Sequence, residues 1–284
     1  MGEEVPAELV ESLEATARDV RRDIIRMTYA AGSGHPGGSL SVTDLLTALI
    51  FREMRIDPSR PSWPDRDRLV LSKGHAAPAL YAALALRGFF PREELRTFRR
   101  LGSRLQAAPD RLRLPGVDVS TGGLGQGLGI AVGMAIDARL DHRPSRIFAI
   151  VGDGECQAGG TWEALLAAAH HELGNLVVIV DRNGFEGEGA TESIVGIEPL
   201  VEKLRAFGFR VGEIDGHDFR EILAEFAAAR APTAGPHAIV ARTVKGKGVT
   251  FMENTHVWHG RPPTKDEAER ALLELGLPPE EARR

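Results

Sequence analysis

The sequence of 284 residues predicts an α/β fold in which helices flank a mostly parallel sheet, with one domain over residues 1–284. Strand-like and helical segments alternate through the second half of the chain, a pattern typical of a parallel sheet covered by helices. The composition, 43% hydrophobic and 26% charged residues, is that of a globular protein long enough to bury a substantial core. No internal repeat, low-complexity tract or linker divides the sequence, so a single domain is the simplest interpretation.

The first half of the chain is predicted to be mainly helix and loop. Apolar spacing predicts helices over 8–30, 41–54, 76–87 and 124–140, and a short strand over 68–71. The glycine-rich stretch 32–38 is predicted to be a loop between the first two helices. Residues 102–121 show no steady period and are predicted to form a long ordered loop, a kind of segment that is often functional.

The second half is predicted to supply most of the sheet. Strands are expected over 146–151, 176–180, 209–214 and 237–241, separated by helices over 161–172, 198–207 and 219–229. Residues 244–263 are expected to form a loop that leads into a short charged helix. The regular alternation makes the strands of this half neighbours in one sheet.

The overall charge and the apolar runs exclude several classes of partner. The formal net charge of -5 gives no global attraction to nucleic acid or to an anionic membrane surface. The longest apolar runs, such as 176–180, are far shorter than the roughly 20 residues of a membrane span. The single cysteine, Cys156, excludes an internal disulfide, and the acidic N-terminus does not resemble a secretory signal. We therefore expect a cytoplasmic protein.

Two polar motifs follow strands that are predicted to be neighbours. Gly152-Asp153-Gly154 ends the strand over 146–151, and Asn183 follows the next strand, with 28 residues between Gly154 and Asn183. Open α/β sheets bind ligands at this carboxyl edge. The glycines allow the backbone to approach a phosphate, and the two side chains offer hard oxygen ligands to Mg²⁺. The tripeptide alone is an ordinary turn sequence, but the strand, helix and spacing together resemble the thiamine diphosphate signature.

The resemblance to the transketolase family extends from about Ser12 to about Pro263, with the motifs in the family's order. The segments that carry it are GSGHPGGSLSVTDLL, DRLVLSKGHAAPALYAAL, STGGLGQGLGIAVGMA and KGKGVTFMENTHVWHG. The resemblance implies a thiamine diphosphate-binding domain of the type that holds the diphosphate and the metal. It also implies transfer of a two-carbon ketol unit from a ketose phosphate to an acceptor.

The resemblance also implies a role for each matching residue. His35 and His259 are expected to face the substrate and to handle protons there. The cofactor is expected to contact His75, Gly122, Gly123, Leu124, Gly154, Asn183, Lys245 and His259. The metal, Mg²⁺ or alternatively Ca²⁺, is expected to bind Asp153, Asn183 and the backbone carbonyl of Phe185. The remaining histidines are interpreted as structural or surface residues, and Cys156 as a buried structural thiol.

The resemblance implies that the active site needs a second chain. In the family, a glutamate of the pyrimidine-binding domain activates the cofactor, and that domain ordinarily follows where this sequence stops. We therefore expect a split enzyme in which a C-terminal transketolase subunit supplies the pyrimidine-binding domain, assembled as α₂β₂ and inactive as a single chain.

Two positions depart from the family pattern. Ala108 stands where the family has a substrate-facing histidine, and Ala158 stands where it has a glutamate at the subunit interface. The loss at Ala108 suggests a specialised acceptor, such as a lipoyl or carrier-protein group. Two other hypotheses remain open at this point: the α subunit of a 2-oxoacid dehydrogenase, and an inactive paralogue that acts as a binding partner.

Overall fold

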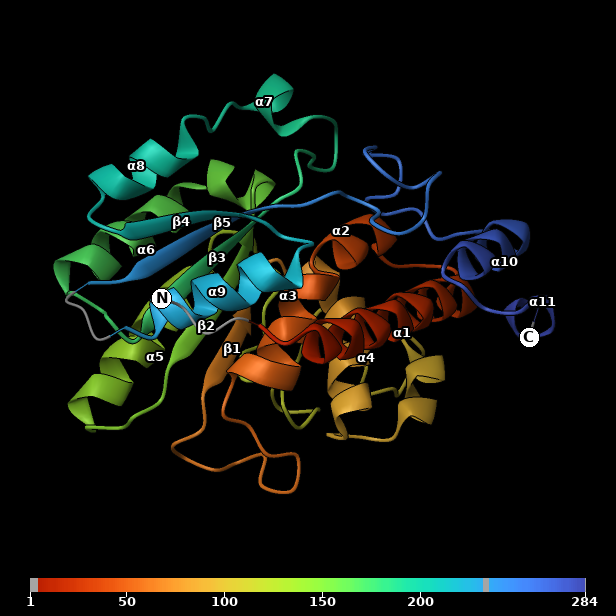
Figure 1. The fold of residues 1–284 in the computed structure, drawn as a ribbon, viewed down its shortest axis with the longest axis horizontal. Coiled ribbons are helices and arrows are strands. Elements are labelled where there is room, and N and C mark those ends of the chain that lie inside the picture. The colour runs from red at the N-terminus through yellow and green to blue at the C-terminus, as the bar shows by residue number, and fades with distance from the viewer. Residues whose placement is uncertain (1–4, 232–234, 284) are drawn as a thin grey trace.

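One parallel sheet of five strands organises the molecule, seen here in a computed structural model that describes residues 5–231 and 235–283 (Figure 1). The strand order is β1-β2-β3-β5-β4. The strands are β1 (Arg68–Leu71), β2 (Ile147–Gly152), β3 (Leu176–Arg182), β4 (Arg210–Asp215) and β5 (His237–Arg242). All the pairings are parallel, which confirms the predicted sheet and its strands to within two residues at each end.

Helices cover both faces of the sheet. The helices of the described residues are α1 (Ala7–Ala31), α2 (Pro36–Ser41), α3 (Thr43–Ala48), α4 (Ala77–Arg87), α5 (Gly127–Leu140), α6 (Gly159–His170), α7 (Thr191–Ile194), α8 (Leu200–Ala206), α9 (Phe219–Ala229), α10 (Lys265–Glu274) and α11 (Pro279–Ala282), of which α10 and α11 pack beside α1 rather than on the sheet. Shorter turns of 3-10 helix occupy Gly74–Ala76, Arg92–Thr97 and Gly154–Gln157, and a π-helical turn occupies Leu49–Glu53.

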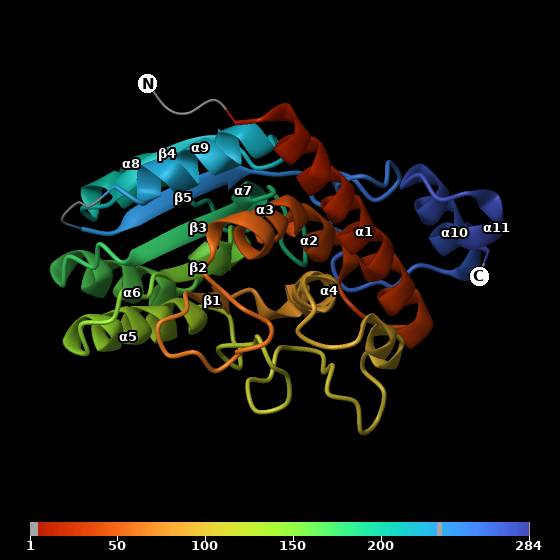
Figure 2. The same ribbon diagram turned by 60° about the horizontal axis from the view of Figure 1, so that its bottom comes forward.

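Two apolar layers hold the sheet. One layer packs α1, α3, α4 and α9 against residues such as Leu69, Phe148 and Ile179, and the other packs α5, α6 and α8 against Val70 and Val178 (Figure 2). Side chains alternate between the faces, and both faces are buried, so these strands appear in the sequence as continuous apolar runs. Each Å² of apolar surface removed from water contributes about 25 cal/mol to the free energy of folding. Burial of these two layers is therefore the main favourable contribution to folding.

Two predicted boundaries were wrong, both at glycine-rich motifs. The stretch 32–38 is not all loop, because α2 begins at Pro36, a residue whose fixed φ suits a first helical position. A Cβ on Gly37 would lie 2.9 Å from the carbonyl oxygen of Trp258, so glycine allows this helix to approach the C-terminal loop. The helix predicted from 124 begins at Gly127, because Gly125 has a φ of +80°, outside the helical region.

Other differences are smaller. The helix predicted over 41–54 is divided at Val42 into α2 and α3 and ends in the π-helical turn. The single turn of α7 was not predicted. The long loop was predicted correctly, since residues 98–126 contain no helix or strand.

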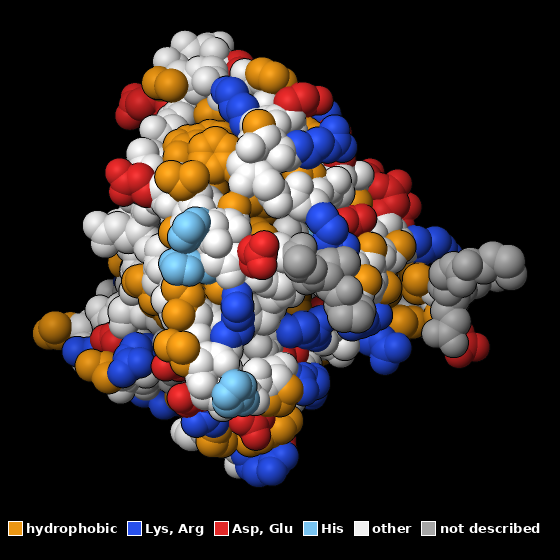
Figure 3. Space-filling model, turned by 90° about the vertical axis from the view of Figure 1, so that its left-hand side faces the viewer, with side chains coloured by type: hydrophobic (Ala, Val, Ile, Leu, Met, Phe, Trp, Pro, Cys, Tyr) orange, Lys and Arg blue, Asp and Glu red, His pale blue; other side chains and the backbone are white. Residues whose placement is uncertain are grey.

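The surface agrees with the weak net charge. The face drawn in Figure 3 mixes acidic, basic and hydrophobic side chains, with no broad field of one sign. Within the part of the chain that the structure describes, no helix combines the length and the apolar character needed to cross a membrane.

Candidate functional site

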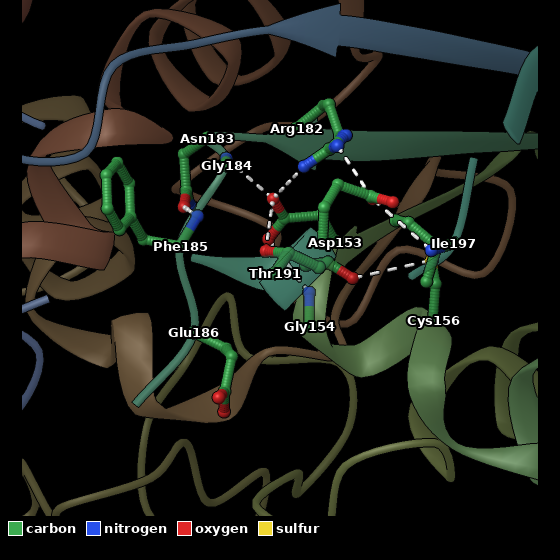
Figure 4. Close-up of polar contacts among 12 residues, drawn as sticks. Asp153, Gly154, Cys156, Arg182, Asn183, Gly184, Phe185, Glu186, Thr191 and Ile197 are labelled. Carbon is green, nitrogen blue, oxygen red and sulfur yellow. Dashed lines mark hydrogen bonds and ion pairs between the residues drawn. The ribbon is translucent and has the colours of Figure 1, made fainter. Parts of the chain in front are cut away.

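The two polar motifs meet at the carboxyl edge of the sheet, as predicted. Strands β2 and β3 are paired neighbours, with Gly152 opposite Asp181 in the register. Asp153 is buried just beyond this pair, and its Oδ2 accepts a 2.6 Å hydrogen bond from the Gly184 amide, next to Asn183. Figure 4 shows the segment 182–186 passing beside Asp153. The parallel register therefore brings together side chains that are about 30 residues apart in the sequence.

The predicted metal ligands are Asp153, Asn183 and the Phe185 carbonyl, and all three residues line one cleft of about 160 Å³. Among the described residues, no cluster of three or more His, Cys, Asp or Glu side chains could hold a metal ion. Protein ligands here would thus number two side chains and a carbonyl. Mg²⁺ suits such a set, because it usually completes its shell with phosphate oxygens and water.

The cleft contains most of the predicted cofactor residues. His75, Leu124, Gly154, Lys245 and His259 line it together with the metal-ligand candidates. Gly122 and Gly123 lead into Leu124 and are exposed. A larger groove of about 700 Å³ lies between α1, Arg92–Thr97 and α10, and it contains none of the predicted residues. Because a binding site is defined by its chemistry, the smaller cleft is the candidate site.

Three histidines from three distant segments form a cluster at the cleft. The ring centroids of His35 and His75 are 5.4 Å apart, those of His35 and His259 5.4 Å, and those of His75 and His259 5.1 Å. Burial lowers the pKa of all three rings, to about 3 for His259. Neighbouring cations lower each pKa further, Lys73 at His75 and Lys245 at His259. The imidazoles are therefore neutral at pH 7 and can each donate one proton and accept another.

Lys245 is the central cation of the cleft. Its Nζ donates to the carbonyl oxygens of Phe185 at 3.2 Å and Glu186 at 3.0 Å, and to Nδ1 of His259 at 3.0 Å. Burial, with Lys73 nearby, lowers its pKa to about 8, so it remains mostly protonated at pH 7. A buried ammonium whose protein partners are mainly neutral is well suited to bind an anion.

A second buried cation, Lys73, was missed by the sequence analysis. Its Nζ lies 2.5 Å from Oδ2 of Asp181 and 3.1 Å from the Gly38 carbonyl oxygen, and it lines the same cleft. Lys73 is 1% exposed and Asp181 is fully buried. A lysine is rarely fully buried unless it is paired with an opposite charge. The signal in the sequence was Asp181, a carboxylate directly after the apolar residues of β3, which needs a buried cation as its partner.

Glu155 was also missed. This buried carboxylate accepts hydrogen bonds from Ser72 Oγ (2.5 Å), from the Gly125 amide (2.9 Å) and from the Gly152 amide (3.2 Å). It therefore joins the ends of β1 and β2 to the glycine-rich turn before α5. Close packing supports the same arrangement, since a Cβ on Gly74 would lie 2.9 Å from the Gly122 amide nitrogen.

The residues present fit a diphosphate with a divalent cation. Lys245 and two neutral histidines supply donors for an anion, and Asp153 and Asn183 supply oxygen ligands for a hard metal. The backbone is tightly placed as well, because a Cβ on Gly154 would lie 2.7 Å from Cβ of Glu186. Both halves of the predicted ligand thus have matching groups in one cleft.

Comparison with known proteins agrees with this chemistry. Residues 13–283 match the family model described as transketolase, thiamine diphosphate binding domain.

The chain belongs to the transketolase family.

Among curated transketolase relatives, single subunits match over nearly their whole length. The 6-deoxy-6-sulfo-D-fructose transketolase subunit SqwG of Clostridium sp. (strain MSTE9) is 44% identical over 93% of this chain and 96% of its own. An apulose-4-phosphate transketolase subunit of Phocaeicola vulgatus is 39% identical over 94% of each chain. These matches confirm transketolase-type ketol transfer, as one subunit of a two-chain enzyme.

Solved transketolases share the fold. The Leishmania mexicana enzyme superposes with a TM-score of 0.89 at 32% identity, over 94% of this chain and 42% of its own. The Campylobacter jejuni enzyme gives 0.87 at 33% identity, over 97% and 44%. The chain thus spans less than half the length of these transketolases, and the thiamine diphosphate-binding fold is confirmed.

The two departures from the family pattern lie on either side of the glycine-rich turn. A Cβ on Gly122 would lie 3.4 Å from Cβ of Ala108, whose carbonyl oxygen accepts a 3.0 Å hydrogen bond from the Tyr81 hydroxyl. A Cβ on Gly125 would lie 2.7 Å from Cβ of Ala158. The loop around Ala108 is therefore ordered against the site. The small side chain at Ala158 packs against the turn.

Proposed function

We propose that this chain binds thiamine diphosphate and a divalent metal in the cleft of about 160 Å³ and, with a partner subunit, transfers a ketol unit from a ketose phosphate. The observation that carries the proposal is the convergence of Lys245, His75 and His259 on the cleft that Asp153 and Asn183 also line. Cationic and neutral donors together with oxygen ligands match a metal diphosphate.

In this proposal the metal binds Asp153, Asn183 and the Phe185 carbonyl. Mg²⁺ is the expected ion and Ca²⁺ the alternative, since both take oxygen ligands. The Phe185 carbonyl accepts a hydrogen bond from Lys245. A metal bound to that oxygen would replace this hydrogen bond, and Lys245 could then donate to the diphosphate instead. Gly154 is expected to offer its amide, and Gly122, Gly123 and Leu124 to line the cofactor.

When bound, thiamine diphosphate supplies the carbon nucleophile and the electron sink for cleaving a bond next to a carbonyl. The residues of this chain are proposed to hold the cofactor and to orient the substrate. His35 and His259 are the proposed proton carriers, because their lowered pKa keeps them neutral and able to accept or donate. His35 does not line the cleft itself but lies against His75 and His259, and this position supports the proposed substrate-facing role.

The proposed partner is a C-terminal transketolase subunit with the pyrimidine-binding domain, in an α₂β₂ assembly. Helices α5 and α6 support a partner, since they expose the apolar side chains of Ile130, Leu140 and Leu166. Leu124, at the cleft, is 47% exposed and adds an apolar group next to the site. Several large apolar side chains exposed on two adjacent helices support a protein contact there.

The donor is proposed to be a ketose phosphate. The residues of the site define the acceptor less closely than the donor. The curated relatives are named for a sulfo-sugar and for a sugar phosphate, so one scaffold serves different small sugars. Ala108 removes a hydrogen-bond donor beside Gly122, and this favours a specialised acceptor, with a lipoyl or carrier-protein group as the second candidate. A cytoplasmic location stays a prediction.

The experiment is a substrate panel on the two-chain complex, run with the parent chain and with Ala108→His. If Ala108 selects the acceptor, the histidine variant shifts the ratio of kcat/KM values between sugar and non-sugar acceptors by about tenfold, the effect of one hydrogen bond. An unchanged donor and acceptor profile would remove the specialised-acceptor hypothesis. Absence of thiamine diphosphate binding by the complex would leave the inactive-paralogue hypothesis instead.

A further inference from the structure

Arg182 joins three carboxylates at the edge of the candidate site. Its Nη1 donates to Oδ2 of Asp153 at 2.9 Å, its Nη2 to Oε1 of Glu192 at 3.0 Å, and its Nε to Oε1 of Glu198 at 3.1 Å. Figure 4 shows the guanidinium directed at Asp153 from the end of β3. All three nitrogens of the guanidinium are therefore used, which only an arginine can do.

The three carboxylates belong to two different segments. Asp153 follows β2 and is 1% exposed, whereas Glu192 and Glu198 belong to the connection between β3 and α8, here named the 184–198 segment. The same segment reaches Asp153 directly, through the Gly184 amide at 2.6 Å and Thr191 Oγ1 at 3.2 Å. It thus closes over the candidate metal ligand from two points along its length.

The 184–198 segment has little regular secondary structure. It forms only one helical turn and one isolated bridge, between Phe185 and Ala190. Residues 192–196 and 198 are exposed, and Ile197 is the member of this stretch that packs into the apolar core. Its order therefore depends mainly on polar contacts. Those at Asp153 and Arg182 connect it to the candidate metal ligand, and Gln157, Lys203 and Lys245 bind other carbonyl oxygens along it.

We propose that Arg182 is a positioning residue that fixes the 184–198 segment against Asp153, and so sets the Phe185 carbonyl and the Asp153 carboxylate in place for the divalent metal. The inference rests on the proposed function, because it takes Asp153 and Phe185 as metal ligands. Arg182 and Gly184 occupy Oδ2 of Asp153, while Oδ1 accepts only from the Gly154 amide among the described residues. One oxygen is thus anchored and the other remains for the metal.

The direction in which metal affinity changes when Arg182 is replaced distinguishes a positioning role from a purely electrostatic one. A cation beside a metal ligand repels the metal, so removal of its charge alone strengthens metal binding. Loss of positioning weakens it, because the ligands must then be ordered when the metal binds. Burial raises the pKa of Asp153 and Arg182 opposes that rise, so loss of Arg182 favours the proton that competes with the metal. A site that is weakened equally at pH 7 and at a higher pH therefore points to lost geometry.

The test compares Arg182→Met with Arg242→Met in the complex with the partner subunit. Arg242 is the matched control, since it is the register partner of Arg182 on β5 and pairs with Glu213, away from Asp153. The first readout is hydrogen exchange of peptides from the 184–198 segment without metal or cofactor. The second is the Kd of Mn²⁺, used as the probe and measured by electron paramagnetic resonance with thiamine diphosphate present.

For Arg182→Met we expect exchange in the 184–198 segment to be about tenfold faster and the Mn²⁺ Kd to be about tenfold higher, with Arg242→Met unchanged in both. Glu192→Gln with Glu198→Gln is expected to accelerate exchange as well, and Arg182→Lys to be intermediate. Unchanged exchange in Arg182→Met, or Mn²⁺ binding as tight as or tighter than in the parent, would overturn the inference. If the parent complex binds no metal, the proposed function fails, and the exchange comparison still decides whether Arg182 orders the segment.

Discussion

The ammonium of Lys245 lies 3.0 Å from Nδ1 of His259. An ammonium can only donate, so Nδ1 must accept and the proton of the neutral imidazole must sit on Nε2. No protein hydrogen bond to that Nε2 exists among the described residues. One lysine therefore does two things: it brings a positive charge to the cleft, and it directs a histidine N–H to a position that a ligand can use.

Replacement of Lys245 should weaken cofactor binding more than folding. Lys245→Met removes one charged donor and releases the His259 tautomer, so thiamine diphosphate should bind the two-chain complex about 10- to 100-fold more weakly. The measurement is the Kd from isothermal titration calorimetry at saturating Mg²⁺. Lys247→Met is the control, because Lys247 lies in the same loop but does not line the cleft, and its Kd should match the parent. Equal affinity for the Lys245 variant would show that the lysine is only structural.

Replacement of His35 should affect turnover rather than cofactor binding. The ring lies against His75 and His259 but outside the cleft that holds the proposed diphosphate groups. We expect His35→Ala to lower kcat about 100-fold or more, the usual contribution of a proton carrier, with the thiamine diphosphate Kd within about threefold of the parent. The opposite pattern, a normal kcat and a much weaker Kd, would assign His35 to the cofactor instead.

Replacement of Glu155 should cost stability. Three donors face its carboxylate, from Ser72, Gly125 and Gly152, so the amide group of Glu155→Gln must meet at least one of them with its own N–H groups. We expect the free energy of unfolding to fall by about 1–3 kcal/mol, measured by urea denaturation. Glu163→Gln, on the exposed face of α6, should change it by less than about 0.5 kcal/mol. A parent-like midpoint for the Glu155 variant would mean that the site tolerates an amide.

The histidine cluster should make the ligand-free chain less stable in mild acid. Burial lowers the pKa of His35, His75 and His259 in the folded state, with Arg99 and Lys245 adding to the effect at His35. Below the unfolded pKa of about 6.5, the unfolded chain binds more protons, so the free energy of unfolding rises with pH in this window. We therefore expect it to fall steadily from about pH 7.5 to about pH 5.

Urea denaturation at several pH values measures this slope. His259→Gln should reduce it by roughly a third, because one of three protonating rings is removed. His256→Gln is the matched control, since His256 is exposed in the same loop, and its slope should equal that of the parent. A flat profile for the parent across this pH window would contradict the assignment of buried neutral histidines.

The fold was predictable because its signals are local or periodic. The continuous apolar runs of β2 and β3 determine two central strands, and their shared direction places Asp153 beside the Asn183 turn. The helix over 219–229 was predicted to the residue from its apolar spacing, and the structure shows that Asp218 caps it by accepting from two backbone amides. Motif resemblance then brought His35, His75 and His259 to one place, which no periodicity would do.

The missed parts depend on contacts between distant residues. Lys73 and Asp181 are 108 positions apart, and only the folded chain shows that they neutralise each other inside the cleft. Glu155 and Gly125 are 30 positions apart and meet through a backbone amide, which leaves no trace in side-chain chemistry. The role proposed for Arg182 likewise depends on three carboxylates that the sequence alone does not place together.

The most direct test of the proposed function uses this chain co-expressed with a candidate C-terminal subunit, with thiamine diphosphate and Mg²⁺ added. Release of glyceraldehyde 3-phosphate from xylulose 5-phosphate is measured with both chains and with each chain alone, in the presence and absence of ribose 5-phosphate. The proposal predicts release that requires both chains and the cofactor and that is lost in Asp153→Asn. Robust release by this chain alone, or no donor cleavage by a complex that binds the cofactor, would contradict it.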